Sequence, residues 1–248
     1  MKPRNPKHQR ILFGAAAGLV GGYLVGTHTA WLILAMPLGI VLLQHQMVRQ
    51  TESVVAMGRL GFYWQIVASL AVLAAIGFLA LRDVGVSLVD LGLIGENLAT
   101  ALGFGVMAGL SAALVMEAID RLLRREETPL VKFVFPRTPG EKAMFVLVSL
   151  MAGFAEELVF RGFMIQFITG WFGSVTFAVL LSSLLFGLVH SYQRFYGVMV
   201  TGLFGLGMAG LYLWQDSLLL VMVAHATYDI FAGLFLGPKD SKGIAASG

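Results

Sequence analysis

The segment AGFAEELVFRGF, residues 152–163, places two adjacent carboxylates and an arginine between two strongly apolar stretches. MFVLVSL precedes it at residues 144–150, and MIQFITGWF follows it at residues 164–172. A helix that crosses a bilayer needs about 20 mostly apolar residues, and this region meets that requirement except at its ionisable groups. Because a charge at the bilayer centre costs about 2.5–3.5 kcal/mol on insertion scales, such groups indicate a bundle interior or a wet cavity.

The whole composition is typical of a polytopic membrane protein. Apolar residues make up 58% of the 248 residues and charged residues only 12%, whereas soluble domains average about 25% charged residues. The chain has no cysteine, which excludes disulfides and thiolate metal sites. The basic start runs directly into an apolar stretch, so we expect no cleavable signal peptide. The expected partner is the lipid bilayer and not a nucleic acid, and the oligomeric state stays open.

Hydropathy predicts an all-α, polytopic transmembrane bundle of about eight spans. The candidate spans are residues 11–27, 30–46, 60–81, 97–119, 143–168, 175–192, 195–214 and 217–236. Only a short polar segment separates the first two, and Pro37 interrupts the second, so a tight hairpin is an open alternative there. We divide the chain into accessory N-terminal transmembrane helices, residues 1–85, and a second transmembrane domain, residues 86–240.

The placement of basic residues supports an even number of spans. All of the 17 Lys and Arg residues except Arg82 and Arg161 would lie on one side of an eight-span bundle. The opposite loops carry acids, namely Asp83, Asp90, Glu96 and Asp216. The positive-inside rule therefore predicts that both termini are cytoplasmic. Short loops and a high glycine content favour the plasma membrane of a prokaryote.

Small residues recur at four-residue spacing in two of the predicted spans. They are Gly14, Gly18, Gly22 and Gly26 in one span, and Thr201, Gly205 and Ala209 in the other. Small residues on one helix face let two backbones approach closely. We interpret both rows as ordinary helix-packing surfaces.

The opening segment contains one self-neutralising pair and one unmatched acid. Glu157 and Arg161 are four residues apart, so they share a helix face with the acid in the favourable N-terminal position. Glu156 is turned away by about 100°. An ion pair that fixes helix packing would explain Glu157 and Arg161, but it would leave Glu156 unexplained.

Two later spans add imidazoles and a further carboxylate. His190 ends the segment FGLVH near a predicted membrane edge, where a histidine is often only a packed amphipathic residue. His225 and Asp229, in HATYD, share a face of the last span, and a hydrogen bond between helices is their ordinary explanation. If the three spans cluster, the site holds a general base, imidazoles and a countercharge, which are the parts that amide hydrolysis requires.

These residues carry a resemblance to a known family. EELVFR fits EExxxR, FGLVH fits FxxxH and HATYD fits HxxxN/D, in order and on successive spans. The chain resembles, over about residues 90–236, the CPBP family of CAAX prenyl proteases and bacteriocin-processing enzymes, also called the Abi family. The resemblance makes residues 86–240 a catalytic domain and implies an intramembrane endopeptidase with a cavity open to the cytoplasm. A membrane-associated protein or peptide would be its substrate.

The resemblance also implies a role for each motif residue. Glu156 is the expected general base on water, His190 would help to hold that water, and Glu157 and Arg161 would orient the first motif. His225 and Asp229 would occupy the oxyanion side. The eukaryotic prenyl protease pattern has asparagine where this chain has Asp229, and an ionised aspartate cannot donate to an oxyanion, so Asp229 would instead orient His225, be protonated or bind metal.

Three questions stay open at this level. Two histidines and a carboxylate could bind zinc or another divalent metal, but the chain has no HExxH pair on one helix, and we favour a mechanism without a cofactor. A proton-coupled transporter or a non-catalytic membrane immunity or scaffold protein would also explain intramembrane acids and histidines. The predicted depths of Glu156 and His190 differ, unless the helix begins early, at Thr138 or Pro139.

Overall fold

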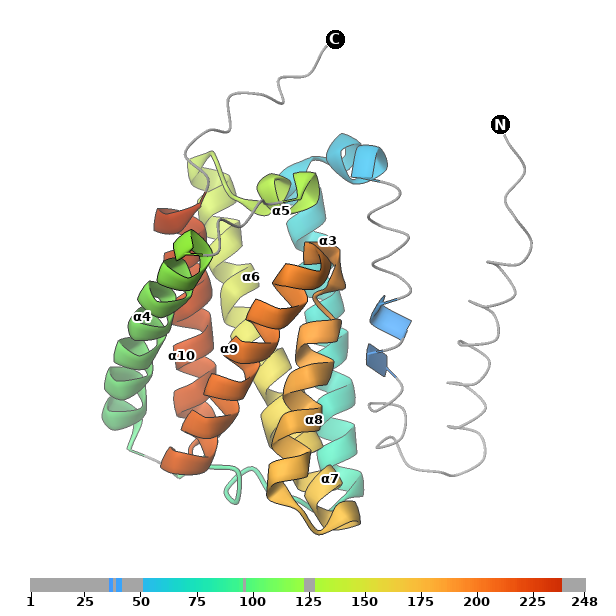
Figure 1. Ribbon diagram of the computed structural model, residues 1–248, viewed down its shortest axis with the longest axis vertical. Helices are drawn as coiled ribbons and strands as arrows, with labels where there is room; N and C mark the ends of the chain where they lie inside the picture. Colours follow the sequence, from blue (N-terminus) through green and yellow to red (C-terminus); the bar gives the residue numbers. More distant parts are fainter. Residues whose placement is uncertain (1–35, 38, 42–50, 96, 123–127, 238–248) are drawn as a thin grey trace, which may run out of the picture.

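The computed structural model describes residues 36–37, 39–41, 51–95, 97–122 and 128–237, and every regular element labelled within these ranges is a helix (Figure 1). The long helices are α3 (Thr51–Asp83), α4 (Leu98–Leu122), α6 (Pro139–Glu157), α8 (Val175–Leu188), α9 (Arg194–Gln215) and α10 (Leu218–Phe231). The shorter pieces are α5 (Pro129–Val134), the π-helix η1 (Leu158–Met164), α7 (Ile165–Phe172), the 3-10 turn η2 (Ser191–Gln193) and the π-helix η3 (Ala232–Leu236).

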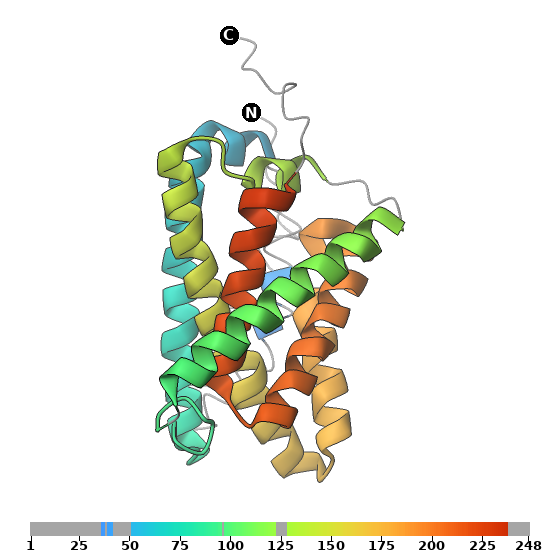
Figure 2. The same cartoon turned by 90° about the vertical axis from the view of Figure 1, so that its left-hand side faces the viewer.

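The helices form one bundle around the continuous rod of α6, η1 and α7. α6 packs between α3 and α10, and α10 packs in turn against α4. Figure 2 shows α4 crossing obliquely over α10. α8 and α9 form a hairpin, in which α8 also packs against η1 and α7. This arrangement surrounds the segment that carries the first motif with helices from the whole second half of the chain.

Five of the described helical segments are long and apolar enough to cross a membrane. They correspond to the predicted spans 60–81, 97–119, 143–168, 195–214 and 217–236. The predicted spans 11–27 and 30–46 lie mostly outside the described residues, as do Gly14, Gly18, Gly22 and Gly26, so the count of eight stays a prediction. Trp171 and Trp214 are 63% and 79% exposed at the same end of the bundle, as is typical of side chains at a membrane interface.

Helix α8 is shorter than predicted, and this reconciles the depths of two motif residues. It has 14 residues, which gives a length of about 21 Å, whereas α6, η1 and α7 together run unbroken from Pro139 to Phe172. In Figure 1 the turn between α8 and α9 lies below the upper ends of α3 and α6. The residues that follow this helix, among them His190, are therefore set back into the bundle and do not lie at its outer edge.

The start of α6 follows the signals in the sequence. Thr138 caps the helix in a capping box, in which its side chain accepts from the backbone N–H of Glu141 and the Glu141 carboxylate accepts from the backbone N–H of Thr138. Pro139 occupies the first turn, where its missing N–H costs nothing. The helix therefore begins four residues before the predicted span, at one of the two expected positions.

Helix α3 bends at Gly58, and the bend separates a short segment at the end of the bundle from the predicted membrane span. Gly58 has φ 76° and ψ 158°, a backbone conformation that is open to glycine and costly for other residues. The seven residues before it lie across the upper end of the bundle, and the rest descends through it (Figure 1). The membrane-crossing part of α3 therefore begins close to residue 60, as hydropathy predicts.

The loop between α3 and α4 holds the start of α10. The backbone carbonyls of Leu91 and Gly92 accept from the N–H groups of Leu218 and Leu219, at 2.9 and 3.1 Å. These N–H groups belong to the first turn of α10, which has no partners of its own for them. Leu91 is fully buried. The loop thus fixes the height at which α10 begins, and with it the position of the third motif.

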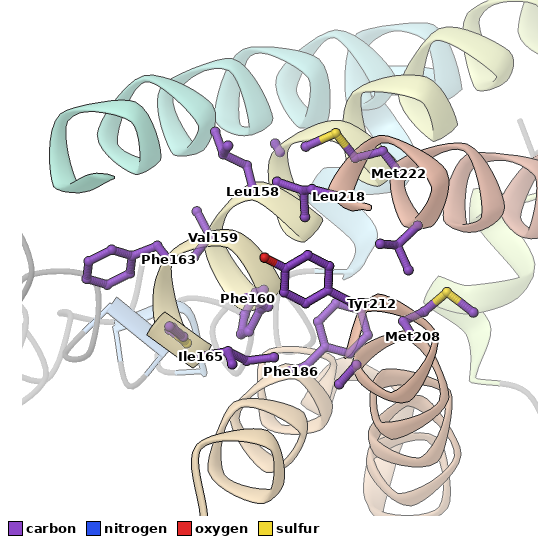
Figure 3. Close-up of a cluster of buried hydrophobic side chains, with 14 of the residues drawn as sticks. Leu158, Val159, Phe160, Phe163, Ile165, Phe186, Met208, Tyr212, Leu218 and Met222 are labelled. Atoms are coloured by element: carbon purple, nitrogen blue, oxygen red, sulfur yellow. The ribbon is translucent and has the colours of Figure 1, made fainter. Parts of the chain in front are cut away.

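The main apolar cluster surrounds η1. Figure 3 shows Leu158, Val159, Phe160 and Phe163 of this π-helix among side chains of α8, α9 and α10. Their neighbours include Phe186, Met208, Tyr212, Leu218 and Met222. Every residue of η1 is buried, so the part of the first motif that η1 carries lies in the core of the bundle.

The contact between α6 and α10 depends on a bare glycine. A Cβ at Gly153 would lie 2.7 Å from the carbonyl oxygen of Met222 and 2.8 Å from the backbone nitrogen of Ala226. We predict that Gly153→Ala destabilises the protein by about 1–3 kcal/mol through overpacking. Thermal unfolding in detergent measures this. Gly207→Ala is the matched control, because its Cβ would meet nothing within 4 Å. Equal melting temperatures for the two variants would contradict the prediction.

The orientation in the membrane can be tested by cysteine labelling, since the natural chain has no cysteine. Val89 is exposed in the loop after α3, and Gly140 is exposed at the start of α6, at the opposite end of the bundle. The positive-inside rule predicts that an impermeant maleimide labels Val89→Cys in intact spheroplasts, but labels Gly140→Cys only after lysis. The reverse pattern would place the basic end outside.

Candidate active site

The first motif lies where α6 changes into a π-helix. Glu156 and Glu157 are the last residues of α6, and Arg161 is in η1. π-helical turns inside α-helices are rare and frequent at functional sites. The change in helix type occurs between the two carboxylates and the arginine, so it sets their relative direction.

Glu157 and Arg161 form a buried ion pair that also reaches a neighbouring helix. Arg161 Nη1 donates to Glu157 Oε1 at 2.8 Å, and the two side chains are 1% and 0% exposed. Arg161 Nη2 donates to the backbone carbonyl of Gly205 in α9 at 2.8 Å. A Cβ at Gly205 would lie 3.2 Å from this nitrogen. The small residue therefore lets the guanidinium reach the backbone of α9.

His225 joins the first and third motifs. Its Nδ1 lies 2.7 Å from Glu157 Oε1, the same oxygen that binds Arg161. Because an ionised carboxylate only accepts, His225 Nδ1 is the donor in this bond. The other ring nitrogen, Nε2, faces Asp229 Oδ2 at 3.6 Å and Glu156 Oε2 at 3.9 Å. The ring is thus fixed on one side and presents its second nitrogen to two carboxylates.

His190 lies on the second motif and shares an aromatic neighbour with the rest of the site. Its Nδ1 lies 2.8 Å from the carbonyl oxygen of Phe186, which can only accept, so Nδ1 is the donor. The Phe186 ring centroid is 4.9 Å from that of His190 and 5.9 Å from that of His225. The Arg161 guanidinium lies 4.5 Å from the same ring centroid. Phe186 therefore contacts residues of all three motifs.

Exposure divides the site into a buried brace and an accessible edge. The brace consists of Glu157, Arg161 and His225, whose side chains are at most 4% exposed. Glu156 and Asp229 are 16% and 28% exposed. The distances from these two carboxylates to His225 exceed an ordinary hydrogen bond. The edge carboxylates are therefore the members of the cluster that a small molecule can approach.

A bound metal ion requires several donor side chains arranged around one point. Among the described residues, no group of three or more His, Cys, Asp or Glu side chains is arranged to hold a metal ion. His225 uses Nδ1 for Glu157, and His190 uses Nδ1 for a backbone carbonyl. Both rings keep Nε2 outside these bonds, so the absence of a metal stays a prediction, and we derive no chemical step through a metal.

Spacing along the sequence predicts only some of the contacts among the six predicted site residues. Spacing predicts the pairs Glu157–Arg161 and His225–Asp229, and both are found within 4 Å. The contact between Glu157 and His225 was not predicted, because these residues are 68 positions apart. The central position of Phe186 was signalled only by its place in the FxxxH pattern.

The comparison with known families matches the part of the chain that carries the three motifs. Residues 138–231 match a family model named Rce1-like and described as type II CAAX prenyl endopeptidase Rce1-like. The family of this model is part of the CPBP family, so the resemblance that the three motifs indicate is confirmed over these residues. The matched segment contains all six predicted site residues and lies within the predicted domain of residues 86–240. No curated protein and no solved structure matches the chain. The family match and the five long apolar helices among the described residues fit an integral membrane protein.

The buried brace gives a stability prediction. Arg161→Met leaves Glu157 as a buried charge, so we expect a loss of about 3–5 kcal/mol in unfolding free energy. The double variant Glu157→Gln/Arg161→Met removes that charge and is expected to recover part of the loss. The matched control is Arg121→Met, whose ion pair with Glu117 is largely exposed and is worth about 1 kcal/mol or less. Equal melting temperatures for Arg161→Met and Arg121→Met in detergent would contradict the brace.

Proposed function

We propose that this protein is an intramembrane endopeptidase that hydrolyses a peptide bond of a membrane-associated protein or peptide. The observation that carries the proposal is the half-buried Glu156 carboxylate, 3.9 Å from a ring nitrogen of His225 whose other nitrogen is already bound. An ion pair built only for packing needs Glu157 and Arg161. It does not need a further carboxylate directed at the same imidazole.

Glu156 is the proposed general base. It takes a proton from a water molecule, and the resulting hydroxide attacks the carbonyl carbon of the scissile peptide bond. The same carboxyl group then returns the proton to the leaving amine, so that the enzyme ends the cycle unchanged. A positioned base of this kind contributes about 10²–10⁴-fold to rate.

His190 is the proposed second contact for that water. Its Nδ1 proton is directed to the Phe186 carbonyl, which leaves Nε2 of the neutral ring as an acceptor. Such a nitrogen can accept one hydrogen of the water while Glu156 removes the other. The hydrogen bond to the backbone fixes the tautomer that this role requires.

His225 and Asp229 are proposed to act on the developing oxyanion. His225 can donate from Nε2 only when that nitrogen carries a proton, because Nδ1 is committed to Glu157. A carboxylate of Asp229 at 3.6 Å favours that proton and orients the ring. In this assignment Asp229 does not donate to the oxyanion itself, so an ionised aspartate is compatible with the mechanism.

The proposed site opens toward the basic end of the bundle, which we expect to face the cytoplasm. Among the described basic residues, Arg59 follows the bend in α3, Lys132 is in α5, Arg137 is in the loop between α5 and α6, and Lys142 is in the first turn of α6. Figure 1 shows these segments together at one end of the bundle. The description of the matched family names a CAAX prenyl endopeptidase. For a prokaryotic chain, a processed peptide or the tail of a membrane protein is the better substrate proposal.

Two experiments test the function. The first compares the protein termini in cells that express the wild type or Glu156→Gln, to find peptides that are cleaved only by the wild type. The second measures cleavage of a quenched farnesylated CAAX peptide by the purified proteins. We expect Glu156→Gln, His190→Ala and His225→Ala each to lower the cleavage rate at least about 10²-fold. Glu156→Gln and His190→Ala should do so without a change in melting temperature comparable to that of Arg161→Met, whereas His225→Ala also removes a donor from the buried Glu157 carboxylate and should lower the melting temperature as well.

Glu117→Gln is the matched control, because Glu117 is an intramembrane-helix acid that pairs only with surface Arg121 in the described contacts. Wild-type cleavage by all three site variants would exclude the proposed enzyme. Proteoliposome proton flux that depends on Glu156, without cleavage, would instead identify a transporter. Full biological activity of Glu156→Gln would indicate a non-catalytic protein.

A further inference from the structure

Ser182 lies outside the three motifs but on the same face of α8 as the second one. Ser182, Phe186 and His190 follow one another at four-residue spacing, so their side chains are stacked along one side of the helix. Phe186 and His190 already belong to the site. The residue one turn earlier is a serine that is 1% exposed, and a buried hydroxyl of this kind needs a partner.

The partner of Ser182 is the π-helix that carries Arg161. Ser182 Oγ donates to the backbone carbonyl of Phe160 at 2.7 Å. Phe160 directly precedes Arg161 in η1. A second contact connects the same two elements, because the Phe160 and Phe186 rings meet edge to face with centroids 5.0 Å apart. A directional bond and an aromatic contact, one helical turn apart on α8, together fix the height of α8 against η1.

We propose that Ser182 is a positioning residue for the reaction. By holding the Phe160 carbonyl it sets the π-helical turn after Glu157, and thereby the direction in which Arg161 and the Glu157 carboxylate face His225. The same bond sets the height of α8, on which Phe186 lies against the guanidinium and His190 follows. This role rests on the proposed endopeptidase activity.

The chain offers a matched control in the next residue. Ser183 is also buried, at 5% exposure, and its Oγ has no hydrogen-bond partner among the described residues. Successive residues of a helix point about 100° apart, so the two hydroxyls do not share surroundings. Ser182→Ala and Ser183→Ala remove the same atom from adjacent buried positions, and only the first removes a contact with η1.

The experiment compares wild type, Ser182→Ala and Ser183→Ala in the full-length protein in detergent. Cleavage is measured on the farnesylated CAAX peptide or on the peptide found by the comparison of termini. Hydrogen exchange of residues 158–165 is followed by mass spectrometry. We expect Ser182→Ala to lower kcat about 10–100-fold, because a displacement of about 1 Å has effects of this size. KM should stay within about twofold, since no substrate contact is lost, and exchange in residues 158–165 should become faster.

The Ser183→Ala variant should match the wild type in kcat and in exchange. A kcat for Ser182→Ala equal to that of Ser183→Ala, or unchanged exchange in residues 158–165, would overturn the proposal. So would a loss of melting temperature in Ser182→Ala with kcat unchanged, which is the result for a purely structural hydroxyl. Failure of the proposed function is distinct: Glu156→Gln would then cleave as fast as the wild type, whatever Ser182→Ala does.

Discussion

One carboxylate oxygen, Glu157 Oε1, holds the site together. It accepts from Arg161 at 2.8 Å and from His225 at 2.7 Å, and it is fully buried. Arg161 in turn binds the backbone of α9 through Gly205. A buried charge is tolerated only when its partners are well placed. The end of α6 and the middle parts of α9 and α10 are therefore tied to a common point, and a displacement of any one would leave an unpaired charge in a low-dielectric interior.

Close helix packing makes this common point possible. α10 approaches α6 at Gly153, and α9 approaches the arginine at Gly205, where larger side chains would meet backbone or guanidinium atoms. Hydrophobic burial does not drive helices together inside a bilayer, so small residues and polar contacts have a larger part in association there. In this bundle small residues and polar contacts occur in the same place, because the glycine contacts bring the backbones near enough for charged side chains to connect them.

The sequence predicted the parts of the fold that depend on neighbouring residues. Hydropathy located the apolar helices, Thr138 and Pro139 marked the start of α6, and four-residue spacing paired Glu157 with Arg161. It did not predict the contact of Glu157 with His225, which depends on how α6 and α10 pack. The bend at Gly58 and the π-helical turn of η1 were also missed. Hydropathy depends only on composition, so it does not distinguish a bend or a π-helical turn from a regular α-helix inside an apolar segment.

The separation of Glu156 from Glu157 by one position explains how adjacent identical residues can have different tasks. A rotation of about 100° directs Glu157 into the brace, where one of its oxygens accepts hydrogen bonds from both Arg161 and His225. The same rotation directs Glu156 to the accessible edge. Its carboxylate lies 3.9 Å from His225 Nε2, which is too far for a hydrogen bond but close enough for an electrostatic interaction. A carboxylate engaged as strongly as Glu157 could not remove a proton from water without breaking the brace. The brace therefore carries the structural cost of buried charge, and this is what leaves the neighbouring glutamate available for chemistry.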